Sequence, residues 1–472
     1  MIKHGLLYLL AKLLTGTVGF LSIFIYTRLL YPDEYGRYAM ILIYVSVGSA
    51  VLYQWFRLGL IRYVPKCRTG LEQYRTLLRT VGICYAAVFL LSALIGLALL
   101  CAGIPFAELS AAMLQLWTMA WFELSQALQR SNLQPVRFGI MGGVKSLLSL
   151  SISILFIKAG WGEIGLLLGI AVGNAAANVL FLKEWKPALY GRYDRALAMQ
   201  LLRYGLPLII SGSMTYIMQS IDRVMIGWLK GDMDAGIYAV GYDFAFQTVG
   251  MLMMVVNLSA LPHVIRKLEQ EGAGEAREQM NNNLRLLLLV SVPVVIGIST
   301  ISFNLSHVIF GAQYAAALHT ILPFIAMMMF IQGIKLYYTD LSYQLGGTTY
   351  WQVVPVAVGI ASNLVLHSIF IPMYGLMGAA VSSLVSCALS LASNLFFTQR
   401  VFRLPYSYQS ISRIVLAGLI MGVLLMPLVS LHGILGLIVQ ISAGAMIYAG
   451  ALIAMNEFGL RTKVRSKLRL RA

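Results

Sequence analysis

Charged side chains within apolar stretches are the residues of this sequence whose presence most needs a chemical explanation. An ionisable group at the centre of a bilayer costs about 2.5–3.5 kcal/mol on insertion scales, so it needs a partner or a water-filled cavity. Each such residue is therefore a candidate for function. Eight of them occur along the chain: Lys12, Arg57, Glu123, Lys145, Asp222, Arg223, Asp243 and Lys335.

The signs of these charges favour the binding of an anion. A surplus of Lys and Arg suits a cavity that receives an anion, whereas a cavity for cationic drugs would need the opposite surplus. We predict a substrate-binding cavity lined by Lys12, Arg57, Lys145 and Arg223. A carboxylate can bind and release a proton or Na+, which suits coupling of transport to a cation. The candidates for cation coupling are Asp222, Asp243 and Glu123.

Purely structural roles would also explain these charges. Arg57 and Lys335 could extend their heads to the membrane surface, as long basic side chains do near helix ends. Glu123 could pair only with Arg130 or another cation at the same end of the membrane. An ion-pair cluster that ties the seventh apolar stretch to the eighth would comprise Asp222, Arg223 and Asp243.

The composition explains why charges are so few. Of 472 residues, 59% are hydrophobic and 11% are charged, and the mean hydropathy is +0.79, which excludes a soluble core with a solvated surface. The sequence predicts an all-α polytopic membrane protein with about 14 transmembrane helices. Their approximate ranges are 5–29, 38–61, 80–102, 108–128, 138–158, 162–182, 205–229, 236–261, 285–308, 316–338, 351–371, 376–398, 410–430 and 433–455.

Lysines and arginines predict the orientation of these helices. If the termini and the even-to-odd connections share one side, that side collects about 26 basic residues, and the other holds only Arg28, Arg37, Lys158 and Lys230. Both termini should therefore be cytoplasmic. Membrane topology and attraction to anionic headgroups then explain most of the formal charge of +17. The same holds for the basic tail from Arg461 to Arg471, so no nucleic-acid partner is expected.

An internal duplication predicts two lobes. A shift of 200 residues lays "GRYA", from Gly36, over "GIYA", from Gly236, and "WGEIG" from Trp161 recurs as "YGLMG" from Tyr374. The expected arrangement is two pseudo-symmetric six-helix lobes plus a C-terminal helix pair, with the pseudo-axis along the membrane normal and a cavity between lobes that rock against each other. The predicted divisions are an N-lobe at 1–183, a cytoplasmic linker at 184–204, a C-lobe at 205–398, and the helix pair with its basic tail at 399–472.

No cofactor or metal site is expected. The four cysteines have no paired or metal-ligand spacing, and small buried hydrophobes are the simpler interpretation. The chain also lacks a glycine-rich nucleotide loop that ends in Lys-Ser or Lys-Thr, so this chain should not use ATP itself.

Motifs in both predicted lobes carry a resemblance to a known family. The segment from Tyr204 to Ala245 contains "GLP", "IDRVMIG" and "GIYAVGY", and the N-terminal "TRLLYPDEYGRYA" and the later "NLVLHSIFIPMYGLMGAAVSSLVS" flank it at a distance. In order and spacing these segments resemble the bacterial polysaccharide or O-antigen flippases, which export lipid-linked oligosaccharides. That family belongs to the multidrug/oligosaccharidyl-lipid/polysaccharide exporter superfamily.

The resemblance implies a V-shaped, two-lobed transporter of the bacterial inner membrane. It would move an undecaprenyl-diphosphate-linked oligosaccharide from the cytoplasmic to the periplasmic leaflet by alternating access, driven by membrane potential or by H+ or Na+ antiport. Partners would be the lipid-linked substrate and membrane lipids. No family motif fixes Lys12, Arg57, Lys145 or Arg223 individually, so their assignment is an inference from charge alone.

Three alternatives remain open from the sequence. The same fold serves multidrug exporters, and a lipid II-type peptidoglycan precursor flippase would share the fourteen spans. An enzyme acting on lipid-linked sugars, such as a polymerase or ligase, is disfavoured because such enzymes carry a substantial external loop. The external connections here are short, about 4 to 12 residues.

Overall fold

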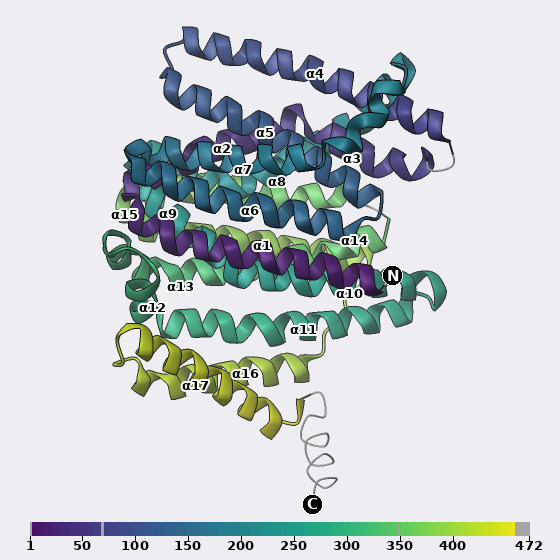
Figure 1. Cartoon of the computed structure of the whole chain (residues 1–472). Coiled ribbons are helices and arrows are strands. Elements are labelled where there is room, and N and C mark those ends of the chain that lie inside the picture. Colours follow the sequence, from purple (N-terminus) through teal and green to yellow (C-terminus); the bar gives the residue numbers. More distant parts are fainter. Residues whose placement is uncertain (1, 68–69, 348, 458–472) are drawn as a thin grey trace, which may run out of the picture. The chain divides into compact units, whose positions relative to one another are not determined.

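The computed structural model describes residues 2–67, 70–347 and 349–457, and every regular element within those ranges is a helix (Figure 1). The basic tail predicted from Arg461 to Arg471 lies outside the described residues. By its contacts the chain forms two compact units. The first contains the residues up to Gly227 together with Gly231–Gly236, and the second contains Trp228–Lys230 together with the residues from Ile237 onward.

Long helices build the first unit, and they run along a common direction (Figure 1). Short 3₁₀ or π-helical elements join several of them, including η2 (Ile157–Trp161) and η3 (Leu182–Tyr190). The long helices are α1 (Ile2–Leu29), α2 (Pro32–Leu52), α3 (Gln54–Tyr63), α4 (Leu71–Cys101), α5 (Phe106–Ser131), α6 (Pro135–Phe156), α7 (Gly162–Leu180) and most of α8 (Arg195–Lys230).

The second unit, apart from Trp228–Lys230 at the end of α8, consists of the residues from Ile237 in α9 onward and is also built from helices. Two of its helices contain π-helical turns, η4 (Phe246–Gly250) and η5 (Lys335–Thr339). Its α-helices are α9 (Asp232–Ala245), α10 (Met251–Gln270), α11 (Ala273–Thr300), α12 (Ser302–Ile309), α13 (Ala312–Ile334), α14 (Leu341–Leu345), α15 (Val353–Val401), α16 (Tyr408–Leu425) and α17 (Gly433–Ala454).

The predicted membrane spans fall on helical segments, and two of them cross a break: 38–61 crosses Tyr53 between α2 and α3, and 285–308 crosses Ile301 between α11 and α12. Within the described residues, ten helical segments are long and apolar enough to cross a membrane by length and composition. Two of them, Pro135–Leu180 and Tyr350–Val401, each contain two predicted spans, so the ten segments account for twelve. The remaining predictions, 108–128 and 205–229, lie on α5 and α8. The chain is therefore a multi-pass membrane protein, as predicted.

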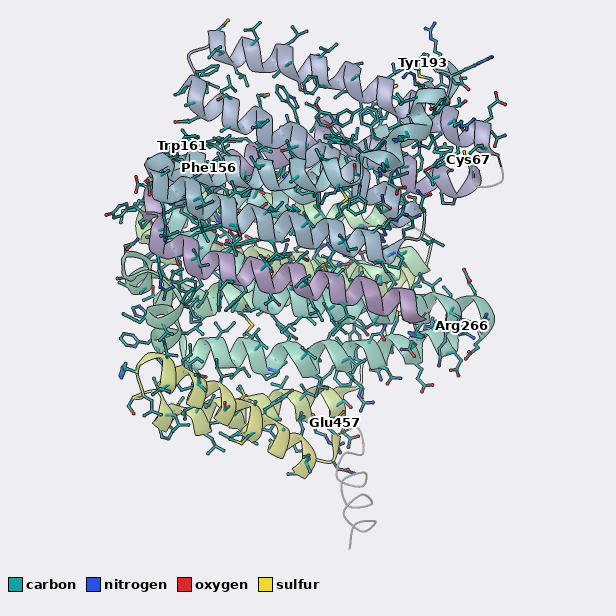
Figure 2. The ribbon with its side chains drawn as sticks, viewed as in Figure 1. Cys67, Phe156, Trp161, Tyr193, Arg266 and Glu457 are labelled. Atoms are coloured by element: carbon teal, nitrogen blue, oxygen red, sulfur yellow. The ribbon has the colours of Figure 1, made fainter. Side chains whose placement is uncertain are left out.

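Glycines in left-handed backbone conformations make the sharp reversals inside those two long segments. Gly160 has φ 87° between α6 and α7, and Gly375 has φ 56° within α15. A side chain is strained at such angles, whereas glycine adopts them freely. Next to the first reversal the rings of Phe156 and Trp161 stack at 4.9 Å (Figure 2).

Caps extend several helices beyond their predicted ends. α2 begins at Pro32, where the Glu34 carboxylate accepts a hydrogen bond from the Tyr31 amide at 2.8 Å. α8 begins at Arg195, because the Asp194 carboxylate accepts from the amides of Ala196 and Leu197. The predicted linker 184–204 therefore contains most of η3 and the first turns of α8.

A reciprocal contact between repeated residues supports the duplication. A methyl group added at Gly36 would collide with the carbonyl oxygen of Asp232, and one added at Gly236 would collide with that of Pro32. Each pair is related to the other by the 200-residue shift, as a two-fold pseudo-axis requires. Both ends of this contact belong to the first compact unit. The predicted lobe boundaries concern internal symmetry rather than contact density, and they stay a prediction.

The C-terminal helix pair is tied to α11 in the second unit. Arg285 and Arg413 both form ion pairs with the Glu457 carboxylate, which is fully buried after the end of α17 (Figure 2). Burial alone would raise the pKa of Glu457. The hydrogen bonds from Arg285 and Ser410, together with the charges of Arg285 and Arg413, outweigh burial and lower the pKa below its ordinary value. Tyr448 adds a hydrogen bond from its hydroxyl to the Leu289 carbonyl at 3.1 Å.

Candidate functional site: a basic cluster in the first unit

Four helices of the first unit carry charged side chains to one place. Lys12 comes from α1, Arg57 from α3, Glu123 from α5 and Lys145 from α6. α1 packs along α6 and α3 packs along α5, and α5 also contacts α6. The cluster therefore depends on helix packing between residues that are far apart in the sequence.

A break in the second predicted span places Arg57. The sequence predicted one helix over 38–61, whereas α2 ends at Leu52 and α3 begins at Gln54. Tyr53 stands at the break with φ −119°, and its hydroxyl is hydrogen-bonded to the Ser92 hydroxyl at 2.9 Å. The Tyr53–Ser92 hydrogen bond lies one helical turn before Arg57, so it helps to position the start of the helix that carries the guanidinium.

Arg57 and Glu123 form an ion pair. Nη1 of Arg57 donates to Oε2 of Glu123 at 3.2 Å, and the two side chains are 27% and 29% exposed. The pair thus borders open space rather than lying in a sealed core. From the sequence, Glu123 could pair with Arg130 or another cation at the same end of the membrane, and Arg57 could reach to the membrane surface. In the structure the partner of Glu123 is Arg57, and the functional role of both residues stays a prediction.

Lys12 and Lys145 complete the basic cluster. The charges of both act on the Glu123 carboxylate. Each ammonium lies near an aromatic ring: that of Lys12 is 5.9 Å from the Phe138 centroid, and that of Lys145 is 5.2 Å from the Phe122 centroid. Among the described residues neither lysine forms a salt bridge, and cation–π contacts of this kind are worth about 0.5–1 kcal/mol at exposed sites.

The basic cluster, defined as Lys12, Arg57, Lys145 and Glu123, carries a surplus of positive charge. Three cations less one carboxylate leave a formal charge of +2. A desolvated surplus of this size is costly unless a counterion or water balances it. The positive surplus therefore suits an anion better than a cation.

The other predicted site residues lie elsewhere on the chain. Arg223 stands on α8 and donates from Nη2 to the Gln219 carbonyl at 2.9 Å. It is not among the cations that act on Glu123. Asp222, beside it, is buried, with 4% exposed. Asp243 stands on α9 in the second unit and is half-buried, so its predicted clustering with Asp222 and Arg223 stays a prediction.

The second unit contains a buried ion pair, of which the sequence predicted only the lysine. Nζ of Lys335 lies 3.2 Å from Oδ2 of Asp340, and the side chains are 7% and 3% exposed. Asn394 on α15 donates to the same carboxylate and to the Thr339 hydroxyl. The sequence predicted Lys335 as a charge within the membrane, with extension of its ammonium to the membrane surface as one alternative. Five-residue spacing does not align side chains on an α-helix, but the π-helical turn η5 does so, with the Asp340 amide bonded to the Lys335 carbonyl at 2.8 Å.

A family comparison matches the region that contains most of these residues. The model of the family described as "Polysaccharide biosynthesis protein" matches residues 25–319, which is more than half of the chain. The chain belongs to this polysaccharide biosynthesis family. The resemblance inferred from the sequence motifs is thereby confirmed.

Curated relatives of this family member are distant. It is 20% identical over 256 residues to the probable low-salt glycan biosynthesis flippase Agl15 of Haloferax volcanii, covering 53% of each protein. It is 23% identical over 273 residues to the amylovoran biosynthesis protein AmsL of Erwinia amylovora, covering 55% of this chain and 67% of that protein. The chain therefore spans about half the length of the first relative and two thirds of the second.

Solved structures confirm the fold of this family member. The lipid II flippase MurJ in an inward closed conformation matches with a TM-score of 0.72 at 16% identity, covering 96% of this chain and 99% of that one. An inward-facing multidrug resistance transporter of the MATE family and MOP superfamily matches with a TM-score of 0.59 at 11% identity, covering 84% and 95%. At these identities the likeness shows a shared all-helical transporter fold.

Proposed function

We propose that this protein is a flippase for a lipid-linked oligosaccharide, with undecaprenyl diphosphate as the expected carrier. The proposal depends on the basic cluster, in which Arg57 pairs with Glu123 while Lys12 and Lys145, on two further helices, lie close enough for their charges to act on the same carboxylate. The family, and the relative named as a glycan biosynthesis flippase, support the same function. Movement would run from the cytoplasmic to the periplasmic leaflet by alternating access of two lobes.

The charge of the cluster fits a diphosphate better than a drug cation. A diphosphate diester carries about two negative charges, and the cluster has a formal surplus of +2. Arginine can bind two phosphate oxygens through its planar fork, and lysine adds a compact point charge. A cationic drug would meet repulsion at the same place. The basic cluster therefore favours the lipid-linked substrate over multidrug export.

Glu123 moderates the affinity of the site in this proposal. Without its carboxylate, three desolvated cations would hold a diphosphate so tightly that release would be slow. The ion pair also holds the Arg57 guanidinium in place before substrate arrives. Binding of the diphosphate would draw Arg57 towards phosphate, and release would restore the pair. The exposed fraction of both side chains leaves room for this exchange.

The barrier to unassisted movement explains why a cavity is needed. Sugar hydroxyls and a diphosphate have no partners in hydrocarbon, where each unsatisfied polar group costs several kcal/mol. A hydrated basic cleft removes much of that cost, while the polyprenyl tail stays in lipid. Moving about two negative charges outward across 100 mV, negative inside, releases about 4.6 kcal/mol at about 2.3 kcal/mol per charge. The membrane potential would therefore favour outward movement of the substrate.

The proposal also includes coupling of transport to H+ or Na+ and a membrane topology. The carboxylates that would bind the coupling cation are Asp222, Asp243 and Glu123, and Arg223 would add to the binding of substrate. Both termini would be cytoplasmic, in an inner membrane. The lobes would be 1–183 and 205–398, joined by the linker 184–204 and followed by the helix pair and tail at 399–472.

Reconstituted protein tests the transport reaction. Liposomes would hold an undecaprenyl-diphosphate-linked oligosaccharide labelled on the glycan, and an impermeant oxidant would measure the fraction in the outer leaflet. We expect Lys12→Gln, Arg57→Gln and Lys145→Gln each to slow flipping about tenfold or more, because each removes a charge-assisted contact worth about 1.5–3 kcal/mol. The matched control is Lys158→Gln, an exposed cation on η2 in the same unit, which should flip at the wild-type rate.

Two further arms of the same assay distinguish the rival substrates. A cationic dye replaces the lipid in one arm, and a lipid-linked peptidoglycan precursor replaces it in the other. Transport of the dye with no movement of diphosphate lipid would refute the proposal. Equal loss of activity in Lys158→Gln and the cluster variants would show that the basic cluster has no particular role.

A further inference from the structure

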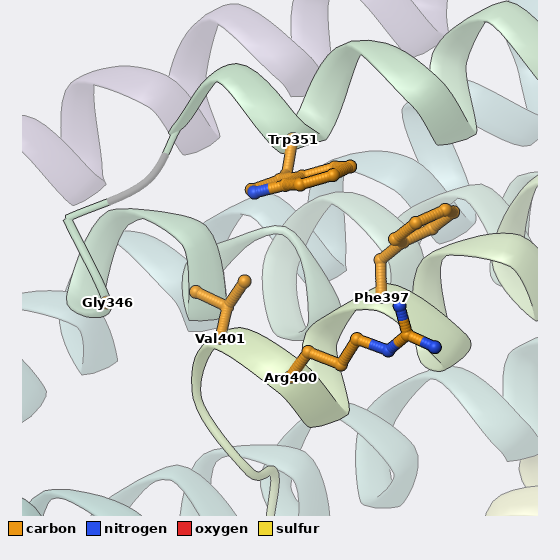
Figure 3. A pocket seen from close by; sticks show the side chains of 5 residues that line it. All are labelled: Gly346, Trp351, Phe397, Arg400 and Val401. Atoms are coloured by element: carbon orange, nitrogen blue, oxygen red, sulfur yellow. The ribbon is translucent and has the colours of Figure 1, made fainter.

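A small pocket at one end of the second unit is independent of the basic cluster. It is lined by Gly346, Trp351, Phe397, Arg400 and Val401 (Figure 3). Trp351 lies on one side of the pocket and Val401 and Arg400 lie on the other, so residues before the start of α15 face residues at its end (Figure 3). The ring of Trp351 stacks on that of Phe397 at 5.5 Å with an interplanar angle of 21°.

The pocket lies where α15 meets a membrane surface. α15 reverses at Gly375, and each of its arms, Val353–Gly375 and Gly375–Val401, is longer than the roughly 20 residues of a bilayer crossing. Its two ends therefore return to the same surface. Exposed aromatic side chains gather there, namely Tyr350, Trp351 and Phe396, as in the belts that anchor proteins at headgroup level.

Two hydrogen-bond donors of the pocket have no acceptor among the described residues. The Arg400 side chain forms no salt bridge there, and its described contact is with the face of the Phe396 ring at 4.8 Å. The indole N–H of Trp351 donates to no described group, unlike those of Trp55, Trp117 and Trp185. The lining contains no carboxylate. An anionic ligand would therefore meet donors without displacing an existing ion pair.

We propose that this pocket binds the headgroup phosphate of an anionic phospholipid of the surrounding membrane. The guanidinium of Arg400 would donate to the phosphate oxygens, and the Trp351 indole N–H would add a second donor. The Trp351–Phe397 stack and Val401 would cover the glycerol and the first methylenes of the acyl chains. A headgroup fits better than a soluble anion, because the pocket joins an aromatic interfacial surface to a cation.

Fluorescence quenching tests the site directly. The full-length protein in neutral detergent would be titrated with dibrominated phosphatidylglycerol and, separately, with dibrominated phosphatidylcholine. The quenching due to Trp351 is the difference between the wild type and Trp351→Phe, which removes one of seven tryptophans. We expect half-maximal Trp351 quenching at an about tenfold lower fraction of the anionic lipid, as one charge-assisted contact predicts.

Arginine variants separate a built site from general surface charge. Arg400→Gln should abolish the preference for the anionic lipid, and Arg400→Lys should keep part of it. Arg403→Gln removes the same charge from an exposed side chain outside the lining and should keep the full preference. Circular dichroism and size-exclusion chromatography of each variant would confirm folding before titration.

Three outcomes would overturn this proposal. Equal quenching by the two lipids in the wild type would mean that the pocket has no affinity for the anionic headgroup. Equal effects of Arg400→Gln and Arg403→Gln would assign any preference to surface charge. Displacement of the brominated lipid by millimolar inorganic phosphate would assign the pocket to a soluble anion.

Discussion

Loss of the Asp340 carboxylate should destabilise this protein strongly, because it strands a buried cation. The Lys335 ammonium lies 3.3 Å and 3.2 Å from the two oxygens of Asp340, and the side chains are 7% and 3% exposed. Removing one partner of such a pair costs about 3–5 kcal/mol, since the remaining charge has no compensation. Asp340→Asn should therefore lower the free energy of unfolding by about that amount.

A double variant shows whether the stranded charge is the cause. Combining Lys335→Met with Asp340→Asn removes both charges and keeps the side-chain volumes similar. Replacing a buried pair by neutral groups is often close to neutral, so we expect the double variant to lose only about 1 kcal/mol. The amide at position 340 can still hydrogen-bond Asn394, which now donates to the carboxylate and to Thr339.

Equilibrium unfolding in mixed detergent micelles provides the measurement, with tryptophan fluorescence as the signal. The matched control is Glu275→Gln, which opens the Lys267–Glu275 pair, whose side chains are 30% and 46% exposed. That variant should lose less than about 1 kcal/mol. If the double variant were as unstable as Asp340→Asn, or if Glu275→Gln cost as much, the assignment to an uncompensated buried charge would be wrong.

Three further predictions follow from described contacts. Glu457→Gln should lower the free energy of unfolding by about 1.5–3 kcal/mol at neutral pH. The folded-state pKa of Glu457 lies below its ordinary value, so this stabilisation persists above about pH 4.3 and fades as the pH falls towards the folded pKa. If the difference in unfolding free energy between the variant and the wild type stayed constant down to pH 3, this prediction would be wrong. Gly36→Ala should lower the free energy of unfolding by about 1–3 kcal/mol by overpacking against the Asp232 carbonyl. Gly48→Ala, whose methyl would lie 3.8 Å from Leu116, should be neutral or stabilising in the same equilibrium unfolding assay. Glu123→Gln should raise the affinity of the basic cluster for the diphosphate lipid and slow its flipping, measured as a lower KM with a lower kcat in the liposome assay; weaker binding with unchanged turnover would refute the moderating role of the carboxylate.

Helix positions were predictable because bilayer thickness and apolar composition act locally. Most predicted spans fall on a single helix, and the predicted gaps at 158–162 and 371–376 coincide with the reversals at Gly160 and Gly375. Helix starts were less accurate, because a cap such as Asp194 allows α8 to extend beyond the apolar stretch. The break at Tyr53 was missed because no proline or glycine stands there and a tertiary contact with Ser92 accompanies it.

The sequence identified the charged residues of the candidate site but could not show which of them lie together. The cost of charge in lipid singles out Lys12, Arg57, Glu123 and Lys145 without structural information. Their common location arises from packing of α1, α3, α5 and α6, for which sequence periodicity holds no information. Asp340 was missed because the predicted span 316–338 ends before it. An α-helical pattern would also place its side chain away from Lys335, and the π-helical turn η5 aligns them.

The reciprocal contact at Gly36 and Gly236 has an evolutionary consequence. Each glycine meets the backbone four residues before the other, so one stretch of chain touches its own copy. Two separate six-helix proteins could make the same self-complementary contact as a homodimer. If the two stretches arose by duplication, a bulky substitution at either glycine would press on the backbone of the other stretch, so both positions would be held to glycine by the same contact.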